Sequence, residues 1–149
     1  MNTLLLQSGN AQGAMEPRSK EGKAFLRRLV EHFDRSCVRL AMDEPTVFIP
    51  LLSSPSLPSP KAMEDALKKD FSSSLAPLSD FVFGLLFALN ALPFEEGNLL
   101  FRCLFLSKDD REFRDVYSHS GFYRLRAKAI RDFFAILPDF LRSLPSDSQ

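Results

Sequence analysis

Residues 81–92 read Phe81-Val-Phe-Gly-Leu-Leu-Phe-Ala-Leu-Asn-Ala-Leu92, in which Asn90 is the single polar side chain. A helix that is apolar on every face is normally surrounded by other helices, because no face can meet water without loss of hydrophobic free energy. Pro93 ends the stretch, since proline cannot continue a helix. The pattern predicts a central helix over about 80–92, and Phe87→Ala is expected to cost about 3–5 kcal/mol of stability.

Two long amphipathic helices are predicted around this centre, one before it and one after it in the chain. Residues 19–42 repeat apolar side chains at helical spacing behind Ser19, a good N-cap residue. Residues 122–144 repeat them in the same way, and Pro138 should kink this second helix. Since each helix has one apolar and one charged face, both are expected to pack against the central helix.

The chain between the first helix and the central helix contains several prolines. Residues 45–52 hold Pro50 in their middle, so at most a short helical turn is expected there. Residues 53–60 alternate Ser and Pro, a composition that predicts a loop.

Another helix is predicted directly after this loop. Ser59 and Pro60 have the residue types that favour the N-cap and the first helical position. The helix is expected to close at Pro77, after which Ser79 or Asp80 caps the central helix.

Residues 99–106 read Leu-Leu-Phe-Arg-Cys-Leu-Phe-Leu, which fits a buried helix and a short strand equally well. We expect a helix, because the chain offers no clear partner strand and an isolated strand leaves its backbone unpaired. Ser107 is then the expected N-cap of a further helix, which breaks at residues 118–121.

The predicted fold is all-α: a compact bundle of five or six helices around the central apolar helix at about 80–92. With 15 Phe and no Trp, the core should be rich in phenylalanine. Residues 1–17 are expected to form a disordered tail and residues 146–149 a second tail. Residues 18–145 then form a single helical domain with the Ser/Pro-rich loop at 53–60.

Charge, cysteines and hydropathy argue against a nucleic-acid partner, a secreted protein and a membrane span. The formal net charge is zero, so no nucleic-acid partner is expected. Cys37 and Cys103 lie in apolar stretches without a second metal ligand nearby, as buried thiols of a cytoplasmic protein would. The first residues lack the features of a secretory signal, and the most apolar run is shorter than the roughly 20 residues of a membrane span.

No catalytic, metal or cofactor site is predicted from the sequence. His32 and His119 stand alone, without a ligand or an orienting acid at a suitable spacing. The acidic residues occur as adjacent pairs, whose members point about 100° apart on a helix. No glycine-rich phosphate loop is present. The sequence therefore favours a protein that is not an enzyme.

The best candidate interaction face is basic. Arg124, Lys128 and Arg131 are three and four residues apart and share one face of the last predicted helix, with Arg126 offset from them. The first helix adds further cations at Lys20, Lys23, Arg27, Arg28 and Arg35. Such faces suit an acidic protein surface or anionic lipid, and they also suit the solvated side of an amphipathic helix.

Two short segments resemble the RUN domain, a helical module of membrane-traffic adaptors. Gly22-Lys-Ala-Phe-Leu-Arg27 is similar to the family's Gly-Arg-Ala-Trp/Phe-Ile/Leu-Arg motif. Gly84-Leu-Leu-Phe-Ala-Leu-Asn-Ala-Leu-Pro-Phe94 is similar to its Leu-Leu-x-Gly-Leu-Asn-x-x-x-Phe motif, and the two occur in the same order. The resemblance implies binding to a small GTPase or a motor adaptor, without catalysis.

These observations leave two main hypotheses for function. The first is a non-enzymatic protein-interaction or adaptor domain, set in membrane traffic by the RUN resemblance. The alternative is a lipid- or membrane-engaging helical bundle whose apolar central helix is masked until binding. An enzyme whose site is completed by another chain is a third reading.

Overall fold

The computed structural model describes residues 16–68, 73–106, 116–137 and 141, and these contain helices and no strand. The helices are α1 (Lys20–Asp43), α2 (Pro45–Leu52), α3 (Pro60–Leu67), α4 (Ala76–Asn90), α5 (Phe94–Leu99) and α7 (His119–Ala135), with a 3-10 turn η1 (Ser73–Leu75) and a π-helix η2 (Leu100–Phe105). The predicted all-α bundle with a Phe-rich core is confirmed. Most of the predicted tail at 1–17, the predicted tail at 146–149, the Ser107 cap and the kink at Pro138 lie outside the described residues. The last two residues of the first tail, Glu16 and Pro17, are described and lie in a turn before α1.

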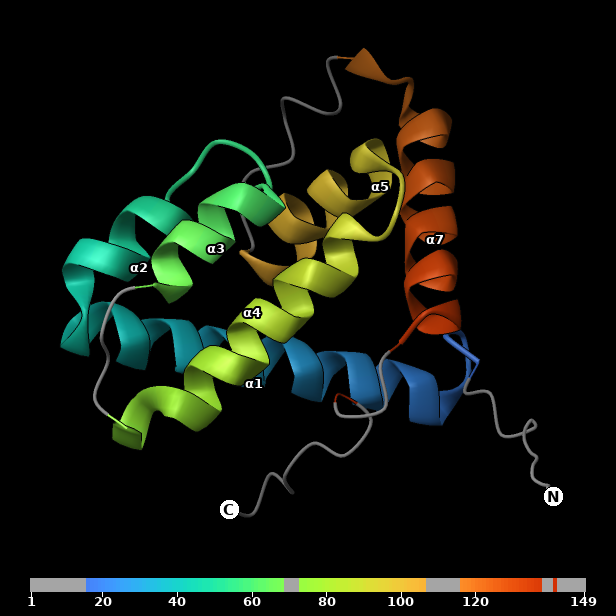
Figure 1. The fold of residues 1–149 in the computed structure, drawn as a ribbon. Helices are drawn as coiled ribbons and strands as arrows, with labels where there is room; N and C mark the ends of the chain where they lie inside the picture. The colour runs from blue at the N-terminus through green and yellow to red at the C-terminus, as the bar shows by residue number, and fades with distance from the viewer. Residues whose placement is uncertain (1–15, 69–72, 107–115, 138–140, 142–149) are drawn as a thin grey trace, which may run out of the picture.

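The helix α4 crosses over the long helix α1 (Figure 1), whereas α7 packs mainly against α5 and η2. At one end of α1, α2 and α3 form a small layer, and at the other end α7 stands upright. α4 packs against α1, α3, α5 and η2, whereas η2 also packs against α1 and α7. Within the described ranges, no helix combines the length and the apolar character that a bilayer crossing requires.

The central helix starts earlier than predicted. α4 begins at Ala76 with Pro77 in its first turn, where the missing proline N–H has no helical partner to lose. The expected cap at Ser79 or Asp80 is therefore wrong, and so is the expectation that Pro77 closes the preceding helix. The Ser79 hydroxyl instead donates to the carbonyl oxygen of Ala76, 3.2 Å away inside the helix.

One stripe of α4 faces solvent. Asp80, Phe87 and Ala91 are exposed and Gly84 is half-buried, at a spacing of four, three and four residues. The Phe87 side chain is 38% exposed, so the expectation that it is buried is wrong. Its truncation should cost clearly less than 3–5 kcal/mol, because less area leaves the core and no enclosed cavity remains.

The long helix α1 and its caps match the sequence pattern. The Ser19 hydroxyl accepts a hydrogen bond from the Gly22 N–H at 2.9 Å, and α1 ends at Asp43, before Pro45. The buried stripe contains Phe25, Leu29, Phe33 and Leu40.

α2 is a full helix of eight residues, so the expectation of no more than a short turn is wrong. Pro50 lies within it and lacks the N–H that would bond the carbonyl oxygen of Thr46. Both residues are exposed, so water can supply the missing hydrogen bond.

The loop between α2 and α3 is held by asparagine side chains of distant helices. The Asn98 side-chain oxygen accepts from the Leu57 N–H at 2.8 Å, and the Asn90 amide donates to the Pro58 carbonyl at 2.9 Å. The single polar residue of the apolar stretch thus fastens the Ser/Pro-rich loop to α4. Ser59 then caps α3 as predicted, although α3 ends at Leu67.

Residues 99–106 are helical, as expected, with an irregularity that the sequence did not reveal. The Leu106 N–H donates to the Phe101 carbonyl, five residues earlier, at 2.9 Å, which is the π-helical pattern. α5, which leads into this segment, lies so close to α4 that a Cβ added at Gly97 would be 2.3 Å from the Leu89 carbonyl oxygen.

The helical structure is interrupted at Tyr117 and Ser118, and the last helix begins at His119, so the predicted break at residues 118–121 is present but shorter than expected. The Ser118 hydroxyl accepts from the Gly121 N–H at 3.0 Å and acts as the N-cap. A serine that caps a helix and a serine in an interruption have the same local sequence. Whether the residues after it form a helix depends on whether they are packed.

Aromatic rings join α1, η2 and α7 into one core. Phe105 of η2 forms edge-on contacts with Phe33 of α1 at 5.4 Å and with Phe133 of α7 at 6.0 Å between ring centroids. Phe134 of α7 contacts Phe25 of α1 at 6.1 Å. These contacts set the spacing of the three elements on which the candidate site lies.

Candidate functional site

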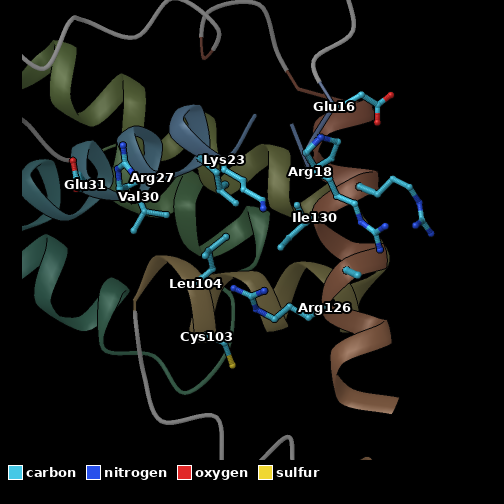
Figure 2. A pocket seen from close by; sticks show the side chains of 14 residues that line it. Glu16, Arg18, Lys23, Arg27, Val30, Glu31, Cys103, Leu104, Arg126 and Ile130 are labelled. Atoms are coloured by element: carbon cyan, nitrogen blue, oxygen red, sulfur yellow. The ribbon is translucent and has the colours of Figure 1, made fainter. Parts of the chain in front are cut away.

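A groove with a volume of about 720 Å³ lies between α1, η2 and α7 (Figure 2). Its floor is apolar and is formed by Leu26, Val30, Cys103, Leu104, Ala127 and Ile130. Its rim is charged and is formed by Arg18, Lys23, Arg27, Arg126 and Arg131, together with Glu16 and Glu31. A volume of this size is typical of binding sites rather than of packing defects.

The floor is formed by apolar residues at the edges of the buried faces of the amphipathic helices. Leu26 and Val30 are one turn apart on α1 and directly follow the buried residues Phe25 and Leu29. Both are half-buried, since their inner edges pack on the core and their outer edges face the groove. Ile130 of α7 is half-buried in the same way, so the floor is an extension of the hydrophobic core to the surface.

The five cations of the rim have no salt bridge to a carboxylate among the residues that the structure describes. Four cations outside the groove form salt bridges with described carboxylates: Arg39, Lys61, Lys68 and Lys128. Figure 2 shows Lys23 and Arg27 on α1 across the opening from Arg126 on α7. With five cations against two carboxylates, the rim carries a net positive charge over an apolar floor.

A tight turn before α1 closes one end of the groove. The Ser19 hydroxyl donates to the Glu16 carbonyl oxygen at 2.7 Å, and the Ser19 N–H donates to the same oxygen at 3.1 Å. A Cβ at Gly22 would lie 1.9 Å from that oxygen, so only glycine lets the turn rest on the helix. The turn brings Glu16 and Arg18 to the rim.

The predicted basic face is divided by the structure. Lys128 donates to Glu96 at 2.7 Å and to Asp132 at 2.9 Å, so it clamps α7 to α5. Arg131 lines the groove, whereas Arg124 does not. The three residues share a helix face, yet they do not meet at one site.

The hydrogen bonds of Lys128 shift its own pKa and that of Asp132. The hydrogen bond to Glu96 raises the pKa of Lys128 above its ordinary value, and the bond to Asp132 adds to the effect. The hydrogen bond from Lys128 lowers the pKa of Asp132. Glu96 is only 4% exposed, and its Oε1 has no hydrogen-bond partner among the described residues. The other carboxyl oxygen of Glu96 accepts the hydrogen bond that Lys128 donates from the surface.

The residues singled out for chemistry are dispersed. His32 packs edge-on against Phe81 with ring centroids 4.4 Å apart, and burial followed by the charge of Arg35 lowers its pKa. His119 packs against Tyr123 at 4.9 Å on another helix. In the described part of the chain, no three His, Cys, Asp or Glu side chains gather as metal ligands.

The two cysteines do not pair with each other. Burial raises the pKa of the Cys37 thiol to about 12, and the charge of Asp34 acts in the same direction. Cys103 lies on the floor of the groove.

Lys23, Arg27 and Arg131 were predicted as cations of two separate helices, not as one site. Arg126 was expected to be offset from the basic face, and Arg18 was not among the predicted residues. The available signal was the pair Leu26 and Val30, whose apolar side chains stand beside the buried stripe of α1 and widen its apolar face.

Comparisons with protein-family models, with curated proteins and with solved structures found no match for this chain, so its resemblance to the RUN domain stays a prediction.

Proposed function

We propose that this chain is a non-enzymatic protein-interaction or adaptor domain, and that the groove between α1, η2 and α7 is its recognition surface. The observation that carries the proposal is the combination of an apolar floor with five rim cations that form no salt bridge among the described residues. An exposed apolar patch rimmed by polar groups is typical of interaction sites.

The composition of the rim supports this function. Four of its five cations are arginines, and arginine is enriched at protein interfaces because its planar group forms paired hydrogen bonds and packs on apolar surface. The RUN resemblance adds membrane traffic as the proposed setting and a small GTPase as one proposed partner.

The test is affinity purification with quantitative mass spectrometry. The wild-type protein is compared with the double variant Arg27→Glu/Arg131→Glu and with the control Arg124→Glu, which changes charge on the same helix outside the groove. We expect a set of partners that is lost with the double variant and kept with the control. Partners that are retained by the double variant would count against the groove as the recognition surface.

An anionic membrane is the second candidate, favoured by the same rim and by the exposed aromatic rings of Phe87 and Phe94. This hypothesis is tested by co-sedimentation with vesicles of increasing phosphatidylserine content. Binding that grows with anionic lipid and falls in Phe94→Ser would support it. Absence of binding at every lipid composition would eliminate it.

A further inference from the structure

The groove has cations on two of its sides and apolar side chains between them. Lys23 and Arg27 come from α1, and Arg126 and Arg131 come from α7. Figure 2 shows Ile130 on the floor between Lys23 and Arg126. An occupant that satisfies this arrangement needs a central apolar stripe with negative charges on both flanks.

An amphipathic helix with acidic flanks has this distribution of groups. Its apolar side chains at i, i+3 and i+7 form the stripe, and carboxylates at the neighbouring positions project to either side. Arginine binds carboxylates through two parallel hydrogen bonds, so four arginines on the rim favour planar anions of this kind.

The volume of the groove is suited to the side chains of a bound helix, with the backbone of that helix remaining at the opening. Two helical turns are about 11 Å long and about 10 Å wide, roughly 850 Å³ as a cylinder. The groove holds about 720 Å³, which is less than the whole helix and enough for several of its side chains.

Other occupants fit less well. A bilayer surface is flat on this scale, so it would contact the rim cations and leave the floor between the two helices uncovered. Residues 1–15 of this chain contain Leu4, Leu5 and Leu6 but no acidic side chain, so this segment would leave the rim cations unpaired.

We infer that the groove binds an acidic amphipathic helix of a partner protein, with its apolar stripe on Leu26, Leu104 and Ile130 and its carboxylates on the arginines of α1 and α7. This inference rests on the proposed function, because it names the class of partner for the same surface.

The test uses a displayed library of alanine-based helical peptides. Each peptide carries leucines at i, i+3 and i+7, and its flanking positions are randomised among Glu, Gln and Lys. Selection on the full chain should enrich Glu on both flanks. Enrichment of Lys or Gln, or no enrichment of Glu over the starting library, would overturn the inference.

The enriched peptide is then measured by fluorescence polarisation. Binding should weaken on the order of tenfold in Arg27→Glu/Arg131→Glu and stay within about twofold in Arg124→Glu. It should also weaken from 50 to 500 mM salt, because the rim charges are solvent-exposed. Amide shifts in the NMR spectrum should centre on Leu26, Leu104 and Ile130, and shifts centred elsewhere would contradict the site.

The two proposals can fail separately. If no acidic peptide is enriched but natural partners still depend on Arg27 and Arg131, the helix inference is wrong and the interaction function stands. If vesicles bind through the same arginines and peptides do not, both are replaced by a membrane site.

Discussion

Replacing Phe105 with Ala should destabilise the protein by about 4–5 kcal/mol. The side chain is 2% exposed and its ring contacts Phe33 and Phe133 edge-on at 5.4 and 6.0 Å. Truncation of a buried Phe generally costs about 3–5 kcal/mol. Two edge-on pairs of about 0.5–1.5 kcal/mol each place this site in the upper part of that range. Phe87→Ala, at a side chain 38% exposed, should cost only about 1–2 kcal/mol.

The assay is urea unfolding followed by circular dichroism at 222 nm, with the free energy extrapolated to zero denaturant. Phe105→Leu serves as a second variant if the alanine variant does not fold. It keeps aliphatic contacts and loses both ring pairs, so about 1–3 kcal/mol is expected. A double-mutant cycle with Phe133→Leu should give a coupling of about 0.5–1.5 kcal/mol. The reasoning is refuted if Phe105→Ala and Phe87→Ala unfold at the same urea concentration.

Three further outcomes are expected. Gly22→Val should cost about 1–3 kcal/mol in urea unfolding and weaken peptide binding, because its Cβ would collide with the Glu16 carbonyl oxygen; unchanged stability would show that the turn can move away. The lowered pKa of Asp132 contributes stability that is present above its ordinary pKa and is lost as the pH falls through the folded value. The raised pKa of Lys128 contributes stability that is present below its ordinary pKa and is lost as the pH rises through the folded value. Urea midpoints measured across pH should lose both effects in Lys128→Met, and an unaltered profile would contradict the clamp. With a thiol pKa of about 12, Cys37 should react with iodoacetamide at pH 8 about a thousandfold more slowly than in the unfolded chain; equal rates by mass spectrometry would contradict its burial.

Most cations of the candidate site could be predicted from the sequence, but their position around one groove could not. Lys23, Arg27 and Arg131 were predicted as cations on amphipathic helices. The first of these helices formed close to its predicted bounds, whereas the last is His119–Ala135 and not 122–144. That Lys128 turns to Glu96 while Arg126 turns to the groove depends on where α5 and η2 pass beside α7. No spacing within the last helix carries that information.

Helical structure, the caps at Ser19 and Ser59, and a core filled by phenylalanines could all be predicted from the sequence. These features depend on contacts within one or two turns, so the 3.6-residue period and the capping residues record them locally. The exposure of Phe87, the π-helix at residues 100–105 and the groove between α1 and α7 could not be predicted in this way. Burial and pairing depend on neighbours far away in the chain, which a local pattern does not record. An apolar pattern shows which side chains are better buried than exposed, and the packing of the other helices decides which of them are buried.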